Sequence, residues 1–190
     1  MERVVYINEE FLPESKACVS FRDRGFVLGD AVFDAERTFD GSIFRLEAHI
    51  NRLFKSLDKA KIDPGLPQSK MIEITHEVLA MNRDLLQPGD DYWIMQRVTR
   101  GLNIVGGELW RSSSPTVIIE CTPLPLKARA PMIRDGLDIF TPDTRRVPPE
   151  CLDPNIKSHN HLNLVLADLE VRERSGHAWA VLLDTRGFLS

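Results

Sequence analysis

One lysine, Lys157, stands where the local pattern changes from an extended segment to a helix. Pro154 disfavours helix in the residue before it and lacks the N–H that a strand interior needs, so we expect the chain to reach Lys157 extended. Beyond it, apolar residues recur at helical spacing, at Leu162, Val165, Leu166 and Leu169. Lys157 is therefore expected at a strand end that faces the start of a helix.

The amine of such a lysine would suit covalent chemistry. The positive end of a helix dipole and partial burial both lower the pKa of an amine, and a neutral amine can form a Schiff base. Most lysines are solvated surface charges, and position alone favours that ordinary role for Lys157. A catalytic role therefore needs support from other parts of the chain.

Two histidines close to this lysine raise the alternative of a metal site. His159 and His161 are two residues apart, a spacing that would bring both rings to one side of a strand. No other cluster of cysteine, histidine or acidic residues has ligand spacing to complete such a site. We predict no metal.

Composition favours a small-molecule enzyme over several other classes. The 190 residues are 43% hydrophobic, enough for a real core, and the net charge of −4 predicts no nucleic-acid partner. Three cysteines without a CxxC pair indicate neither a disulfide framework nor a structural zinc site. No apolar run suggests a signal peptide or a membrane span, so we expect a cytoplasmic protein without a membrane partner.

Periodicity and turn residues predict a mixed first domain over residues 1–122. Asp40-Gly41 favours a type I′ hairpin turn, and helices are expected over 46–61 and 67–82. In the strand expected over 92–100, alternate residues face opposite sides, with Trp93 and Met95 on one of them. Further strands are expected at 4–7, 11–12, 36–39, 42–44 and 115–122.

Three prolines mark the expected domain boundary. Residues 123–131 contain Pro123, Pro125 and Pro131 and are expected to form an exposed linker. The second domain, 132–190, would hold a strand at 136–140, the Lys157 segment, a helix ending near Gly176 and an apolar strand at 178–183, followed by a turn at 184–187.

Several blocks, in order, resemble one family across most of the chain. They are Arg22–Phe26, Gly29–Asp34, Phe39–Gly41, Phe44–Leu53, Arg145–Pro149 and Leu152–Ser158, followed by Asn160 and the helix from Leu162. This set is similar to the class IV (fold-type IV) pyridoxal-phosphate-dependent aminotransferases. That family includes branched-chain and D-amino acid aminotransferases, (R)-selective amine transaminases and aminodeoxychorismate lyase.

The resemblance implies a fold and a set of site residues. The fold would be α/β (α+β), with a small N-terminal α/β domain and the first part of a larger pseudo-barrel α/β domain. Lys157 would form the Schiff base with pyridoxal 5′-phosphate, Arg52 would bind its phosphate with a bidentate fork, and His161 would approach its phenolic oxygen. The substrate would contact Phe26, Val32, Trp93 and Met95.

The implied reaction moves an amino group between an amino acid or amine and a 2-oxo acid, in a homodimer. Branched-chain amino acids are the first expectation, although the arginine that branched-chain enzymes carry at the Met95 position is absent. Alternatives are an (R)-amine or D-amino acid transaminase and aminodeoxychorismate lyase. Arg97 and Arg100 could each recruit a carboxylate or form a structural salt bridge.

The resemblance also implies that this chain is incomplete. A glutamate that pairs with the pyridine nitrogen, and further phosphate-binding loops, are expected beyond Ser190. A truncated, non-catalytic dimerising fragment is therefore the alternative outside catalysis.

Overall fold

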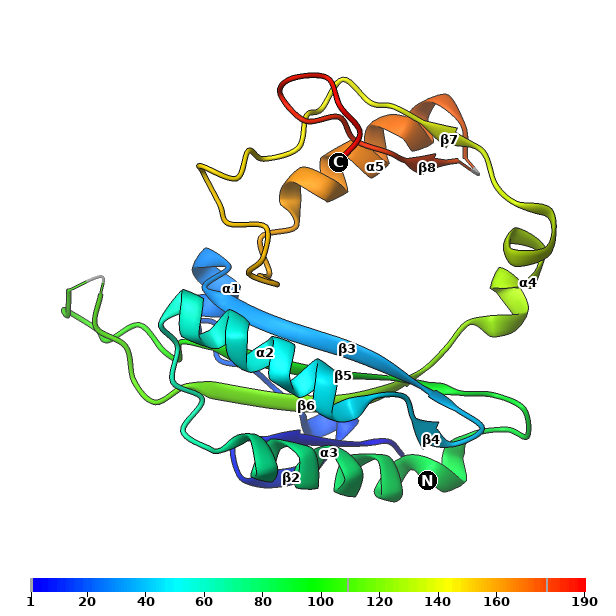
Figure 1. Ribbon diagram of the computed structural model, residues 1–190. Coiled ribbons are helices and arrows are strands. Elements are labelled where there is room, and N and C mark those ends of the chain that lie inside the picture. The colour runs from blue at the N-terminus through cyan, green and yellow to red at the C-terminus, as the bar shows by residue number, and fades with distance from the viewer. Residues whose placement is uncertain (1, 109, 177) are drawn as a thin grey trace. The chain divides into compact units, whose positions relative to one another are not determined.

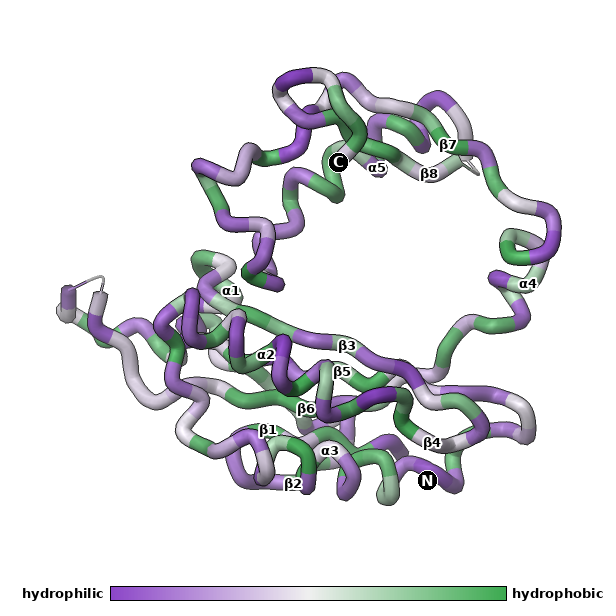
Figure 2. The backbone as a smooth tube through the Cα atoms, in the orientation of Figure 1, coloured by the Kyte–Doolittle hydropathy of each residue, from purple (hydrophilic) through white to green (hydrophobic). Residues whose placement is uncertain are grey.

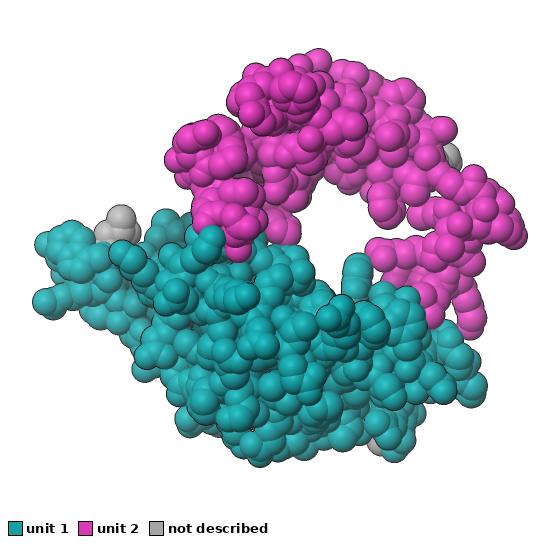
Figure 3. All heavy atoms as spheres, viewed as in Figure 1, with its two compact units in different colours: residues 1–124, 156–159 teal, residues 125–155, 160–190 magenta. Residues whose placement is uncertain are grey.

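The structure, a computed structural model, describes residues 2–108, 110–176 and 178–190 (Figure 1). Its chain divides into two compact units, coloured separately in Figure 3. The first contains the residues up to Leu124 together with Ile156–His159, and the second contains Pro125–Asn155 and Asn160–Ser190. The division after Leu124 lies inside the segment expected as a linker. Ile156–His159 was expected in the second domain and instead packs with the first unit.

A six-stranded antiparallel sheet with two long helices forms the first unit, so the expected mixed α/β class is confirmed. The strand order is β2-β1-β6-β5-β3-β4. The strands are β1 (Val4–Ile7), β2 (Glu10–Pro13), β3 (Ala31–Phe39), β4 (Ser42–Ile43), β5 (Tyr92–Thr99) and β6 (Thr116–Pro123).

The turn between β3 and β4 has the predicted two-residue form. Asp40 and Gly41 have φ angles of 49° and 73°, and Phe39 pairs with Ser42 across the turn. Positive φ at both central positions is the signature of a type I′ turn, which matches the twist of the flanking strands. The Asp-Gly signal therefore located this hairpin correctly.

Two helices, α2 (Leu46–Ala60) and α3 (Gln68–Asn82), cover one face of this sheet. Both follow the predicted ranges closely, and the apolar residues that recur at helical spacing in α2 are buried, namely Leu46, Ile50, Leu53 and Leu57. The two helices and the sheet share one core, formed by Val32, Leu46, Ile50, Leu53, Leu57, Met71, Ile74, Val78, Leu79, Tyr92, Ile94, Val98, Val117 and Ile119 with a few neighbours.

The strands alternate, except at their ends, between that core and an opposite face, which we call the open face. Its side chains are all partly exposed, and the strand register brings them together in rows; they are Phe33, Ala35, Arg37, Trp93, Met95, Arg97, Ile118, Glu120 and Thr122. The predicted division of β5 into two faces is confirmed. Figure 2 shows that β6 is mainly hydrophobic whereas the middle of β3 is hydrophilic.

The first unit also contains short helices. Helix α1 (Arg24–Leu28) begins at Asp23, whose carboxylate accepts a 2.7 Å hydrogen bond from the backbone N–H of Gly25. Strand β3 begins at Ala31, ahead of the strand expected at 36–39. Two 3₁₀ turns, η1 (Glu14–Lys16) and η2 (Arg83–Leu85), follow β2 and α3.

The segment around Lys157 pairs with the edge of β3 through backbone hydrogen bonds. The backbone N–H of Phe33 donates to Lys157 O at 2.9 Å, and that of His159 donates to Ala31 O at 3.0 Å. The extended approach predicted before Lys157 is wrong, because turns occupy residues 149–151 and 154–155. Three prolines in 148–154 remove backbone donors there, and Asp153 caps a local turn through the N–H of Asn155.

The second unit is smaller and holds a two-stranded parallel sheet. It contains α4 (Leu126–Asp135), β7 (Ile139–Phe140), α5 (Leu162–Arg174) and β8 (Trp179–Ala180). The segment 123–131, expected to form an exposed linker, contains the first part of α4, which has no buried residue and includes Pro131. The strand predicted at 178–183 is reduced to β8, and the turn at 184–187 is confirmed by the 3.1 Å hydrogen bond from Gly187 N to Asp184 O.

Helix α5 differs from its prediction in which side it buries. Ala167 and Val171 are fully buried, whereas the predicted apolar stripe remains exposed, with Leu162 at 70% and Leu169 at 53%. Small and β-branched side chains fit closely against β8, and no described residue of this chain covers the leucine side. Among the described residues, no helix is long and apolar enough to cross a membrane.

Candidate active site

Lys157 is held at both its backbone and its side chain by the first unit. Its N–H donates to Ser56 Oγ on α2 at 3.2 Å, and its carbonyl accepts from β3. Its amine Nζ lies 4.2 Å from the centroid of the Phe33 ring on the open face. A cation over an aromatic face is attracted by the ring, so this contact fixes the direction of a long and flexible side chain.

The environment lowers the pKa of Lys157 below its ordinary value. Burial is the largest cause, because it penalises the charged ammonium; the charge of Asp34 opposes this shift, and that of Arg52 adds to it. The direction predicted from the sequence is therefore found, with burial as its leading cause. A larger fraction of neutral amine is what a nucleophilic lysine requires.

Arg52 lies one helical turn before Ser56 on α2 and forms a side-on ion pair with Asp34 of β3. Nε of Arg52 donates to Oδ2 of Asp34 at 2.7 Å, and Nη2 donates to Oδ1 at 2.6 Å. The Asp34 side chain is fully buried, whereas that of Arg52 is 54% exposed. This pair aims the guanidinium outwards, and no hydrogen bond from Nη1 is present within the described part of the chain.

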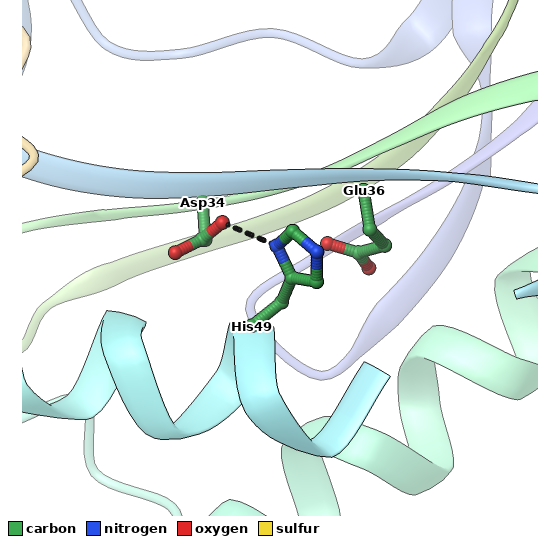
Figure 4. Close-up of side chains that lie close together, drawn as sticks. All are labelled: Asp34, Glu36 and His49. Carbon is green, nitrogen blue, oxygen red and sulfur yellow. Dashed lines mark hydrogen bonds and ion pairs between the residues drawn. The ribbon is translucent and has the colours of Figure 1, made fainter. Parts of the chain in front are cut away.

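His49 completes the environment of Asp34. Figure 4 shows Asp34 and Glu36 projecting from β3 toward α2, with the His49 ring between them. Nδ1 of His49 lies 2.9 Å from Oδ1 of Asp34, and an ionised carboxylate only accepts, so Nδ1 carries the proton. Burial alone would raise the pKa of Asp34, but hydrogen bonds from Arg52, His49 and the Ala35 N–H outweigh it and hold that pKa below its ordinary value.

Glu36 is a second buried carboxyl with the opposite protonation behaviour. Its pKa is raised to about 8, because burial, together with the nearby charge of Asp34, outweighs a hydrogen bond from Gln96 and the charge of Arg52. Gln96 Nε2 donates to Glu36 Oε1 at 2.6 Å, and Glu36 Oε2 has no hydrogen-bond partner among the described residues. Glu36 is therefore mainly neutral at pH 7, while Asp34 is ionised.

Asp34, Glu36 and His49 also meet a geometric criterion for metal ligation, since one ligand atom from each lies within 4.8 Å of the others. Both oxygens of Asp34 already accept hydrogen bonds from Arg52, whose positive charge would oppose a cation there. The contacts instead suit a different task, namely fixing the position of Arg52.

The substrate residues predicted from the sequence fall in different places. Trp93 and Met95 lie on the open face with Phe33. Val32 is only 1% exposed and belongs to the core on the other side of the sheet. Phe26 is 76% exposed on α1, and His161 is the residue at which α5 begins, in the second unit.

Sequence reasoning missed Asp34, His49, Glu36 and Ser56 as residues of the site. One signal was available, because His49, Arg52 and Ser56 follow at i, i+3 and i+7 and so share one side of α2. Polar residues alternating along β3 were a second signal, since a buried strand face seldom carries two carboxylates. The sequence does not show which side of α2 faces β3.

The residues present fit pyridoxal phosphate in two respects. The partly buried Lys157 offers an amine with a lowered pKa to an aldehyde. The guanidinium of Arg52, held by Asp34, keeps exposed donors for a phosphate, which a planar fork binds well. Both residues are anchored on α2, Arg52 directly and Lys157 through Ser56.

Comparison with known proteins adds to this geometry. A family model described as "Amino-transferase class IV" matches residues 31–190. A putative branched-chain-amino-acid aminotransferase from Methanocaldococcus jannaschii is 36% identical over 97% of this chain and 61% of its own length. D-alanine aminotransferase from Staphylococcus haemolyticus is 34% identical over 52% of this chain and 33% of its own length.

Solved structures match the whole chain in fold. Branched-chain amino acid aminotransferase from Escherichia coli superimposes with a TM-score of 0.87 at 22% identity, covering 100% of this chain and 62% of that one. The branched-chain aminotransferase from Thermoproteus uzoniensis, solved with norvaline, gives a TM-score of 0.82 at 21% identity, over 100% of this chain and 62% of its own. The chain thus has the fold-type IV architecture and spans about three-fifths of the length of these proteins.

Proposed function

The chain belongs to the class IV aminotransferases, and from that premise we propose that its protein transfers an amino group between an amino acid and a 2-oxo acid. Enzymes of this family use pyridoxal 5′-phosphate. The observation that carries the proposal is the placement of Lys157, whose amine lies over Phe33 with a pKa lowered by burial, beside the outward-facing Arg52. The contacts that hold both groups lie within the first unit.

Each residue of the site has a distinct part in the proposed reaction. Lys157 would attach to the aldehyde of the cofactor and, once released by the substrate, would move the proton at the substrate Cα as general base and acid. Pyridoxal phosphate, when bound, supplies an electron sink for that proton removal. Arg52 would bind the phosphate, and Asp34 with His49 would hold the guanidinium in place. His161, a predicted cofactor contact, remains part of this proposal.

For the substrate, we favour branched-chain amino acids. The name of the relative from Methanocaldococcus jannaschii supports this choice. The open face supports it too, because it carries the apolar side chains of Trp93, Met95 and Ile118 as well as Phe33, over whose ring the Lys157 amine lies. D-alanine is the second candidate, supported by the relatives that carry that name.

We also propose that the protein is a cytoplasmic homodimer. Helix α1 and its surroundings expose large apolar side chains, including Phe21 at 72% and Phe26 at 76%, which supports an interface between copies. Cys18, Cys121 and Cys151 are free thiols, as is usual for proteins of reducing compartments.

Trapping of the cofactor tests this function. The full-length protein is incubated with pyridoxal phosphate, reduced with borohydride and digested, and the modified peptide is identified by mass spectrometry. We expect cofactor on Lys157, loss of the adduct in Lys157→Ala, and retention in Lys55→Ala, which removes an exposed lysine of α2. Turnover of amino acid and 2-oxo acid by Lys157→Ala would overturn the proposal.

A further inference from the structure

Two arginines at the end of β5 differ sharply in what they bind. Arg100 is fully engaged: Nε and Nη2 donate to the two oxygens of Asp30 at 2.8 and 2.9 Å, and further bonds reach Lys61 O and Ala60 O at the end of α2. These carbonyls are the negative end of the helix dipole, so Arg100 joins β5 to α2. Its role is structural.

Arg97 instead lies on the open face, in the same row as the aromatic ring beneath Lys157. Its Cα partners are Phe33 on β3 and Ile118 on β6. Side chains of directly paired residues on one face lie about 4.5–5.5 Å apart at Cβ. Phe33 therefore has the amine of Lys157 over its ring and the start of the Arg97 side chain as its direct neighbour.

The guanidinium of Arg97 is only partly satisfied by its own protein. Nη1 pairs with Oε1 of Glu120, and Nη2 has the thioether sulfur of Met95 at 3.2 Å, which is a weak acceptor. Among the described residues Nε makes no hydrogen bond, and the side chain is 27% exposed. A half-buried guanidinium with spare donors beside a reactive amine is suited to a second anion.

We propose that Arg97 binds a carboxylate of the substrate, so that it selects carboxylate-bearing donors over simple amines. The inference rests on the proposed aminotransferase function. Glu120 holds the guanidinium while no substrate is present, and its negative charge weakens the binding of a second carboxylate at the same group. Arg97 and Glu120 together would then set affinity for the substrate, without a part in proton transfer.

The test compares ligands that differ only in charge. The full-length protein loaded with pyridoxal phosphate is titrated with 4-methylpentanoate and with its neutral amide, and binding is followed through inhibition of turnover. In Arg97→Leu we expect affinity for 4-methylpentanoate to fall about 10- to 100-fold, as expected for the loss of one charge-assisted hydrogen bond. Affinity for the neutral amide should not change. Glu120→Gln, which keeps an acceptor for Arg97, should bind the carboxylate more tightly.

Substrate kinetics add an independent readout. For Arg97→Leu and Arg97→Lys, kcat/KM is compared for leucine, for glutamate and for a primary amine without a carboxylate. If kcat/KM falls for both amino acids, Arg97 binds the α-carboxylate. If it falls for glutamate alone, Arg97 binds the side-chain carboxylate. Either result supports the proposal. Equal losses for amine and amino acids, or unchanged discrimination between carboxylate and amide, would overturn it.

Failure of this inference can be distinguished from failure of the proposed function. Borohydride labelling of Lys157 is measured in every variant, and Arg83→Leu serves as a control that removes an exposed arginine. Intact labelling with unchanged ligand selectivity overturns the role of Arg97 alone. An unlabelled wild-type protein overturns the aminotransferase proposal, and the role of Arg97 with it.

Discussion

Asp34 and Arg52 share a bidentate ion pair, 2.7 and 2.6 Å long, in which a fully buried carboxylate holds a half-exposed guanidinium. The pair joins β3 to α2 at the level where Ser56 binds the backbone of Lys157. A rigid fork of this kind loses little side-chain entropy when a further anion binds, because the guanidinium is already oriented. The arrangement leads to four predictions.

Arg52 should contribute mainly to phosphate binding. We expect Arg52→Leu to lower affinity for pyridoxal phosphate about 10- to 100-fold, as for loss of a charge-assisted pair, and to leave affinity for pyridoxal nearly unchanged. The two affinities can be measured by absorption titration. Lys55→Leu, which removes an exposed cation of the same helix, is the control. Equal losses for both ligands would show that Arg52 acts on the fold and not on the phosphate.

Asp34 should also influence the reactivity of Lys157. The negative charge of Asp34 opposes the lowering of the Lys157 pKa by burial, so Asp34→Asn should lower that pKa further. The rate of Schiff base formation with pyridoxal, followed from pH 6 to 10, should therefore reach half its maximum at lower pH in the variant. Pyridoxal is used because it lacks the phosphate that Arg52 binds. An unchanged or higher midpoint would contradict the prediction.

Glu36 should make the protein less stable as pH rises. Its pKa of about 8 lies above the ordinary 4.5, so between these values the unfolded chain has released a proton that the folded protein keeps. Stability therefore falls from pH 4.5 to about 8 and then levels off.

Glu36→Gln removes this dependence, and its amide can donate to Oε1 of Gln96, which accepts no hydrogen bond from the residues that the structure describes. Relative to wild type, we expect a gain of roughly 3 kcal/mol at pH 8 and much less at pH 5. Urea unfolding at several pH values measures the difference, with the exposed Glu47→Gln as control. Parallel curves for wild type and Glu36→Gln would contradict the assignment.

Ser56 should support the position of Lys157. Ser56→Ala removes the acceptor of the Lys157 N–H, and an unpaired, partly buried donor costs about 1–3 kcal/mol. We expect a loss of that size in urea unfolding together with slower borohydride labelling of Lys157. Ser69→Ala, at an exposed position of α3, should change neither quantity. Normal labelling in Ser56→Ala would mean that the strand contacts alone hold the lysine.

Local signals identified much of the first unit correctly. The Asp-Gly turn, the apolar stripe of α2 and the alternation of β5 depend on residues near one another in sequence, whose backbone and burial preferences agree with the final fold. Prediction was weaker where a segment depends on its surroundings. The proline-containing α4 and the exposed leucine side of α5 are examples, because helix formation and burial there are decided by packing.

The sequence by itself determined the elements of the first unit, the candidate lysine and the family resemblance, all of which depend on residue types at short or fixed spacing. Only the tertiary structure decided that Lys157 pairs with the edge of β3, 124 positions from Phe33 in the chain, and that Asp34 holds Arg52. It also showed that Arg97 and Arg100, which the sequence left equal, have different contacts. Such pairings depend on strand register and on the side of a helix that faces the sheet, and these are fixed by burial of the whole core.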